Sequence, residues 1–270
     1  MRIIDKGKGT PVVLVPGLQG RWEYLQSTVD ALSRSQRVVT FSLCDEPSWG
    51  ESTLGDISLD RLVKQIDDVL DDRGLERAVI CGVSFGGLVA LRFAATRPQR
   101  TSALVLASAP GPGWHLKRKH RRYVRFPWVS APLFLAGMPR RLRKEIATAI
   151  PNGLERLTFI GGLLSLLVRA PLSPARMAAR ARLIDGVDNV GACAHIASPT
   201  LLITGEPELD HVVPADGTIQ YAQLIPGSVA VTLRRTGHLG CLTRPTAFAD
   251  AIGEFLRRAG VTSRSGEHAA

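Results

Sequence analysis

The chain has 270 residues, with 34 Lys and Arg against 24 Asp and Glu, which gives a formal net charge of +10 at pH 7. Its 45% hydrophobic and 21% charged residues are ordinary globular proportions and exclude a largely disordered chain. The four cysteines stand far apart with no C-x-x-C pair, which argues against a disulfide scaffold or a structural zinc site and predicts buried thiols in a reducing compartment.

Short apolar runs alternate with helical patterns through the first 109 residues and again after residue 198. The expected strands cover 11–17, 37–44, 77–84, 101–109, 198–205 and 228–237. The expected helices cover 21–34, 58–73, 85–98, 215–224 and 245–258. Because the strands are almost continuously apolar and alternate with helices, the sequence predicts an α/β fold whose mostly parallel sheet is flanked by helices.

The region between the two halves has a different pattern. Residues 110–197 contain helix-like segments broken by proline and glycine, without a strand signal. We therefore expect a core made of 1–109 and 198–260, a helical insertion at 110–197 that acts as a lid (cap), and a flexible tail at 261–270.

Neither a leader nor a membrane span is indicated by the apolar runs. The opening residues lack the apolar stretch of a secretory signal, and the longest apolar runs reach about half of the roughly 20 residues that a spanning helix needs. These features predict a soluble, cytoplasmic protein.

A candidate nucleophile stands at "GVSFGG", Gly82 to Gly87, where an expected strand turns into an expected helix. A serine at such a tight turn is held exposed, and the glycines around it let neighbouring backbone approach closely. The amides at the start of the helix point toward its oxygen. Ser84 is therefore predicted to be a nucleophile rather than part of an ordinary glycine-rich turn.

Serine needs an oriented base, and the six histidines offer one clear candidate. His238 lies in "RRTGHLG", directly after the last expected strand and with glycine on either side of its turn. The acid that orients it should lie between the serine and the histidine in the chain. Three acids compete in the loop "TGEPELDHVVP", namely Glu206, Glu208 and Asp210.

The set of "PGLQG", "DEPSWGES", "GVSFGG", "TGEPELDHVVP" and "GHLG", in this order, resembles the α/β-hydrolase fold superfamily, in particular its esterase- and lipase-like serine hydrolases. The likeness covers about residues 9–258. In that family an acid stands four residues before a proline, and counting back from Pro214 gives Asp210. Counting forward from Gly205 gives Glu208, so both stay open, with Asp210 preferred because aspartate is the commoner orienter.

The resemblance implies a Ser84–His238–Asp210 triad and an oxyanion hole made of the backbone N–H groups of Leu18 and Phe85. It implies cleavage of a carboxylic ester through an acyl-enzyme, with no metal or organic cofactor. The same residues would serve a lactonase, a thioesterase or a carbon–carbon bond hydrolase, and a small-molecule receptor could retain them without turnover. The turn "DEPSWGES" is expected to pack beside the site.

The insertion carries the charge. Residues 111–195 hold 15 basic and 4 acidic residues, whereas the rest of the chain holds 19 and 20. Residues 115–125 include six basic residues and no acid. This segment predicts contact with an anionic lipid surface, an amphiphilic acyl substrate, or only a solvated helix face; nucleic acid is not expected. The apolar runs 128–137 and 159–168 are expected to roof the substrate pocket.

Overall fold

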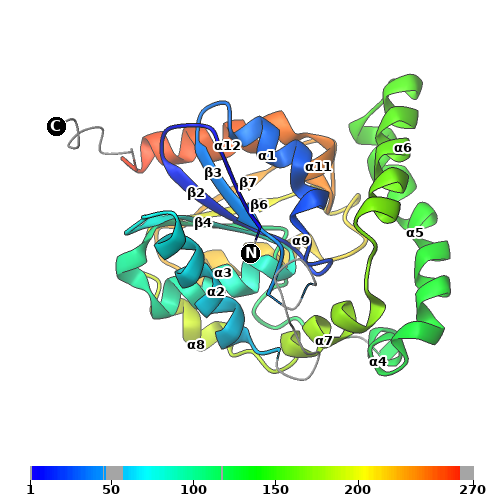
Figure 1. The fold of residues 1–270 in the computed structure, drawn as a ribbon, viewed down its shortest axis with the longest axis horizontal. Helices are drawn as coiled ribbons and strands as arrows, with labels where there is room; N and C mark the ends of the chain where they lie inside the picture. The colour runs from blue at the N-terminus through cyan, green and yellow to red at the C-terminus, as the bar shows by residue number, and fades with distance from the viewer. Residues whose placement is uncertain (1, 45, 47–56, 117, 262–270) are drawn as a thin grey trace.

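Within the residues that the computed structural model describes (2–44, 46, 57–116 and 118–261), seven strands form one sheet (Figure 1). The strand order is β1-β3-β2-β4-β5-β6-β7. The first pairs with β3 antiparallel, and the other neighbouring pairs are parallel. The strands are β1 (Ile3–Lys6), β2 (Pro11–Val15), β3 (Arg37–Phe41), β4 (Ala78–Val83), β5 (Thr101–Ala107), β6 (Thr200–Thr204) and β7 (Val229–Thr232). The α/β fold predicted from the sequence is confirmed.

Helices follow the strands in the alternating order that the sequence predicts. Those of the core are the 3-10 helices η1 (Trp22–Leu25) and η3 (Pro98–Arg100), and α1 (Gln26–Leu32), α2 (Leu59–Asp72), α3 (Phe85–Thr96), α9 (Ala215–Ile219), α10 (Tyr221–Leu224), α11 (Gly240–Thr243) and α12 (Pro245–Arg258). The helix expected at 21–34 is divided between η1 and α1, and that expected at 215–224 between α9 and α10.

Two strands differ most from the prediction. The short edge strand β1 was not expected, because its four residues include two charged ones and give no apolar run. The strand expected at 228–237 ends at Thr232. Its continuation turns at Arg235, whose φ is +64°, and the Thr236 carbonyl accepts a hydrogen bond from the Glu206 N–H at 2.7 Å. The chain must leave the sheet here to bring the next residues over the end of β6.

The central strands of the sheet are buried on both faces, and their successive side chains point to opposite faces. Val13, Ile80 and Leu104 pack with α2, α3 and α8 (Asn189–Cys193) on one face. On the other face, Val12 and Val79 pack with α1 and α12. This double cover explains why the strands read as continuous apolar runs.

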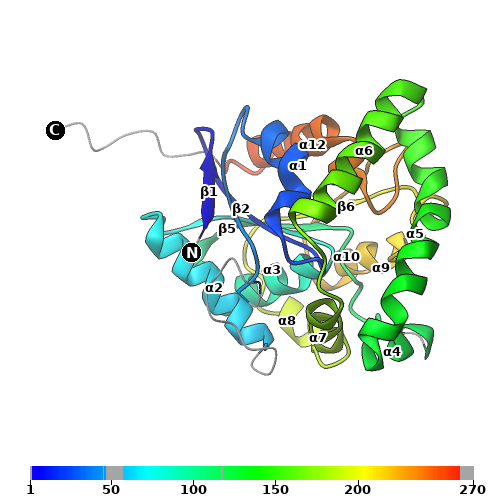
Figure 2. The ribbon, with the colours of Figure 1, turned by 45° about the vertical axis from the view of Figure 1, so that its right-hand side comes forward.

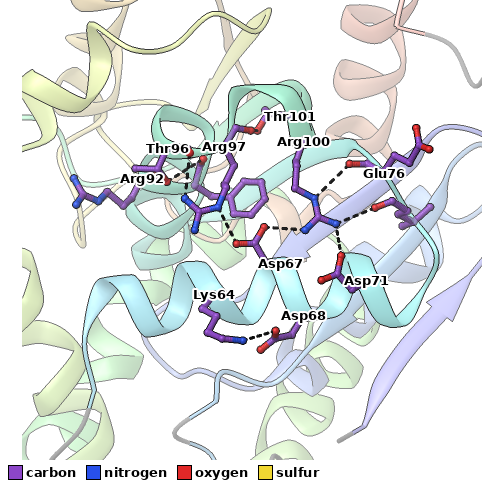
Figure 3. Close-up of polar contacts among 12 residues, drawn as sticks. Lys64, Asp67, Asp68, Asp71, Glu76, Arg92, Thr96, Arg97, Arg100 and Thr101 are labelled. Atoms are coloured by element: carbon purple, nitrogen blue, oxygen red, sulfur yellow. Dashed lines mark hydrogen bonds and ion pairs between the residues drawn. The ribbon is translucent and has the colours of Figure 1, made fainter.

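An ion-pair network ties α2 to the end of α3 and to η3 (Figure 3). Asp67 accepts from Arg97 Nε at 2.9 Å and from Arg100 Nη1 at 3.0 Å, and Arg100 Nη2 also reaches Asp71 at 2.6 Å. These partly exposed pairs contribute little individually, but two arginines sharing one carboxylate fix the helices relative to each other. They hold in place the far end of the helix that begins at the candidate nucleophile.

The described residues of the helical insertion contain helices and no strand. It consists of α4 (Arg118–Arg125), α5 (Pro127–Ala149), α6 (Gly153–Arg169), α7 (Pro174–Ile184) and α8, and it connects β5 to β6. Figures 1 and 2 show α4, α5 and α6 at the side of the molecule opposite the C-terminus. Of the expected turn at 45–52, only Glu46 lies among the described residues, and residues 262–270 of the expected tail lie outside them.

Candidate active site

The candidate nucleophile lies at the tip of a strained turn between β4 and α3. Ser84 has φ +53° and ψ −121°, a backbone conformation that residues other than glycine rarely adopt. Its N–H donates to the Ala107 carbonyl at 2.8 Å, and its carbonyl accepts from the Gly87 N–H at 2.8 Å. These two bonds offset the strain and leave the hydroxyl at the carboxyl end of the sheet.

Glycines are required at this turn because backbone crowds it. A Cβ at Gly82 would lie 2.2 Å from the Gly86 carbonyl oxygen, and a Cβ at Gly86 would lie 2.4 Å from the Val15 carbonyl oxygen. Real Cβ contacts are longer than 3.0 Å. The "GVSFGG" spacing therefore serves the close approach of β2, β4 and α3, as the sequence predicted.

His238 follows β7, at the same carboxyl end of the sheet as Ser84. Its Nε2 lies 3.1 Å from Ser84 Oγ, although 154 residues separate the two in the chain. At this distance the imidazole can accept the hydroxyl proton. The ring is only 10% exposed, so few water molecules compete for the contact.

Asp210 lies on the opposite side of the imidazole. Its Oδ2 is 3.3 Å from His238 Nδ1, and its Oδ1 accepts the N–H groups of Val212 and Val213 at 2.9 and 3.0 Å. The side chain is 1% exposed. A carboxylate held in this way favours the imidazole tautomer with its proton on Nδ1, which leaves Nε2 free to accept from serine. Glu208, its competitor in the loop, is exposed.

The two expected oxyanion donors belong to segments that adjoin Ser84. Phe85 is the first residue of α3, where backbone N–H groups have no partner within the helix. Leu18 follows Gly17, and a Cβ at Gly17 would lie 3.4 Å from the Ser84 Cβ. The Gly20 N–H closes a turn onto the Gly17 carbonyl at 2.9 Å. The loop that carries Leu18 therefore packs directly against the serine turn.

Two buried charged residues of the insertion, which no sequence pattern indicated, contact the loop of Leu18 and the segment around His238. Arg180 of α7 is fully buried; its Nη1 donates to the Leu18 carbonyl at 2.8 Å and its Nη2 to Glu46 Oε1 at 2.6 Å. Glu145 of α5, 1% exposed, accepts three hydrogen bonds from the segment around His238. Burial raises the pKa of the Glu145 carboxyl. The three donors and the nearby His238 lower it in part, and the pKa stays above its ordinary value.

The two apolar runs of the insertion do not form the expected roof. Trp128, Val129 and Leu133 of the first run, and Leu164 and Val168 of the second, are exposed. No residue of α6 is buried. Among the described residues, no group of three or more His, Cys, Asp or Glu is placed to hold a metal ion.

Comparison with known proteins identifies the family. The model of the alpha/beta hydrolase family matches residues 12–251, and the chain therefore belongs to this family. It is 27% identical to a pimeloyl-[acyl-carrier protein] methyl ester esterase of Nitrosomonas europaea, over 93% of this chain and 98% of the relative. It is 30% identical to a putative carbamate hydrolase of Klebsiella pneumoniae, over 92% of each.

Solved structures share the fold across almost the whole chain. A thermophilic esterase from Thermogutta terrifontis superimposes with a TM-score of 0.78 and 23% identity, covering 96% of this chain and 93% of the other. At this identity the likeness supports the fold alone and leaves the chemistry to the residues of this chain.

Proposed function

We propose that the protein is a serine hydrolase that cleaves carboxylic esters through an acyl-enzyme at Ser84. The observation that carries the proposal is the unbroken row of contacts from Ser84 Oγ to His238 Nε2 (3.1 Å) and from His238 Nδ1 to Asp210 Oδ2 (3.3 Å). Three separate loops supply these side chains, and each follows a strand at the carboxyl end of the sheet. The order and roles match a serine–histidine–acid triad.

The first half-reaction forms the acyl-enzyme. Ser84 Oγ attacks the acyl carbon while His238 Nε2 takes the hydroxyl proton, and Asp210 stabilises the resulting imidazolium. The tetrahedral oxyanion accepts the N–H groups of Leu18 and Phe85. As the intermediate collapses, the bond to the leaving oxygen breaks and His238 gives its proton to the departing alcohol.

The second half-reaction releases the acid. Water enters where the alcohol left, His238 takes one of its protons, and the resulting hydroxide attacks the acyl carbon. The bond to Ser84 Oγ then breaks, and the proton returns from His238 to the serine. The free carboxylic acid leaves and the resting state is restored.

Two of the similar proteins described above favour an ester substrate by their names: one is a methyl ester esterase, and the solved structure is that of an esterase. A lactone, a thioester or a carbon–carbon bond would use the same residues, and a receptor would bind without turnover. A series of p-nitrophenyl esters of increasing chain length, run beside a lactone and an acyl thioester, separates these possibilities by their kcat/KM.

Ser84→Ala tests the nucleophile. We expect it to lose fluorophosphonate labelling and about 10⁶-fold in kcat while the protein stays folded. The matched control is Ser108→Ala, because Ser108 also has a positive φ (+45°) and lies at the end of the adjacent strand β5. Labelling that persists in Ser84→Ala would exclude this serine, and loss of labelling in Ser108→Ala alone would transfer the role.

A second pair of variants tests the acid. Asp210→Asn is expected to lower kcat by about 10⁴-fold, because an amide cannot hold the imidazole in the required tautomer and charge state. Glu208→Gln, which changes an exposed side chain in the same loop, is expected to stay within about threefold of the parent. The reverse ranking assigns the role to Glu208.

We further propose that the insertion contacts an anionic lipid surface. Helix α4 carries Arg118, Arg121, Arg122 and Arg125 with no acid in its sequence. Directly after it, Trp128 and its apolar neighbours in α5 are exposed (68% for Trp128). Helix α6 presents a second exposed apolar stripe at spacings of three and four residues: Leu154, Leu157, Ile160, Leu164 and Val168. Basic residues beside exposed apolar side chains are typical of interfacial helices.

Charge favours an anionic lipid surface over a second copy of this chain as the partner. Two insertions, each with a net excess of basic residues, would repel each other. No single described helix is long and apolar enough to cross a membrane; only the bent pair α6 and α7 together reaches that length and composition. A surface contact is therefore the arrangement that we propose.

Co-sedimentation with vesicles tests this contact. Arg122→Glu changes the charge by two, which at about 1 kcal/mol per charge should weaken binding to phosphatidylglycerol vesicles by about 30-fold. Arg257→Glu makes the same change on α12, in the core, and should have little effect. Equal binding to neutral phosphatidylcholine, or equal loss in both variants, would contradict the proposal, and capture of an acidic protein instead of vesicles would replace lipid as the partner.

We place this activity in the cytoplasm. All four cysteines are free and buried, which suits a compartment that keeps thiols reduced.

A further inference from the structure

The last turns of α5 cross both loops that carry the candidate base and acid. Lys144 Nζ donates to the Glu208 carbonyl at 3.4 Å, in the loop of Asp210. Arg235, in the loop of His238, donates from Nη2 to the Thr148 carbonyl of α5 at 3.1 Å. Glu145 lies between these two contacts in the helix. A part of the insertion is therefore fixed to the catalytic edge of the core.

One carboxylate oxygen of Glu145 accepts hydrogen bonds from the backbone on both sides of His238, the candidate base. Its Oε1 accepts the N–H of Gly237 at 2.8 Å and the N–H of Leu239 at 2.6 Å. It also accepts the hydroxyl of Thr236 at 3.0 Å. The two residues that flank His238 are thus held by the same atom, which fixes the direction in which the imidazole leaves the backbone.

Burying the Glu145 carboxylate costs free energy, which indicates that its hydrogen bonds serve a purpose beyond packing. Glu145 is 1% exposed, and an ionised carboxylate in such a place is unfavourable unless several donors satisfy it. An apolar residue would satisfy the packing of a helix face that already contains Leu142 and Ile146. It would leave the N–H groups of Gly237 and Leu239 without this acceptor.

We propose that Glu145 is a positioning residue for His238, through which the helical insertion sets the geometry of the catalytic base. This inference rests on the proposed function, since it assigns Glu145 to the same reaction. It makes the last turns of α5 a support of the active site. Displacing α5 by a small distance would move the imidazole relative to Ser84 Oγ, and a shift of about 1 Å is enough to slow such a reaction about 100-fold.

Three substitutions separate positioning from general support. Glu145→Gln keeps a carbonyl oxygen at the place of Oε1, so we expect kcat within about threefold of the parent. Glu145→Asp keeps the charge but withdraws the oxygen by one methylene, and Glu145→Ala removes it. Both are expected to lose about 10- to 100-fold in kcat, with KM for a p-nitrophenyl ester changed less than about twofold.

The matched control is Ile146→Ala, which creates a cavity in the same buried helix face and leaves the three hydrogen bonds of Glu145 to the loop of His238 in place. We expect it to lower the melting temperature while kcat stays within about threefold of the parent. The inference is overturned if Ile146→Ala loses as much kcat as Glu145→Asp, or if Glu145→Asp and Glu145→Ala keep the parent kcat. It is also overturned if Glu145→Gln is as slow as they are.

Fluorophosphonate labelling distinguishes this failure from that of the proposed function. If the parent protein is not labelled at Ser84, the proposed function fails. If the parent is labelled and Glu145→Asp is labelled at the same rate, only the role of Glu145 fails. A reduced labelling rate in Glu145→Asp, restored in Glu145→Gln, supports both.

Discussion

Gly86→Ala tests whether the close contact between α3 and the end of β2 sets the site geometry. The added Cβ would lie 2.4 Å from the Val15 carbonyl oxygen and 2.5 Å from that of Pro16. Because ordinary contact begins near 3.4 Å, the two backbones must separate by about 1 Å. A separation of this size between Ser84 and the loop of Leu18 should lower kcat about 100-fold. Overpacking of this kind costs about 1–3 kcal/mol of stability.

The assay is ester turnover and thermal unfolding measured on the same preparations. We expect the melting temperature of Gly86→Ala to fall by a few degrees, since about 1 kcal/mol shifts it by roughly 2–4 °C in a chain of this size. Gly253→Ala is the control, because a Cβ there meets no atom within 4 Å. That variant should keep full activity and gain up to about 1 kcal/mol from better helix propensity. Parent-like kcat in Gly86→Ala would refute the link between this contact and the oxyanion geometry.

Three further outcomes follow from buried groups. Arg180→Met should lower stability by about 3 kcal/mol, because it leaves Glu46 buried with only more distant arginines; thermal unfolding measures this, and an unchanged melting temperature would contradict it. Burial raises the pKa of the Cys193 thiol to about 11, so the folded protein should resist a thiol-reactive disulfide at pH 8 and react only after unfolding. Burial also raises the pKa of Glu145 above its ordinary value of 4.5, so its ionisation destabilises the folded state as pH rises past that value. Glu145→Gln should therefore melt higher relative to the parent at pH 7 than at pH 4, and a constant difference would contradict this sign.

The sequence could predict those parts of the site that depend on neighbouring residues. The turn at Ser84 needs only a strand, a helix and glycines within six residues, and all of these are readable from Gly82 to Gly87. Asp210 and His238 could be proposed because each follows an expected strand, and parallel strands bring their carboxyl ends to one edge. The choice between Asp210 and Glu208 could not be made from spacing, since it depends on which side chain the loop turns inward.

The end of β7 shows a similar limit. The run 228–237 has the alternation of a strand, and nothing local shows that it must stop after Thr232. It stops because the chain has to turn at Arg235 and bring His238 over the serine, which is a requirement of the site rather than of the strand. Local preference is overridden where tertiary geometry demands it.

The contacts of the insertion were hidden for a different reason. Arg180 and Leu18 are 162 residues apart, and Glu145 and Thr236 are 91 residues apart, so no local pattern connects them. A weaker signal was present. Leu142, Glu145 and Ile146 share one face of α5 by spacing, in a stretch that is otherwise rich in arginine. An acid on an apolar helix face implies a buried carboxylate with hydrogen-bond donors nearby. The structure shows that these donors belong to the loop of His238, and this position of α5 is what leads from a buried carboxylate to a hypothesis about catalysis.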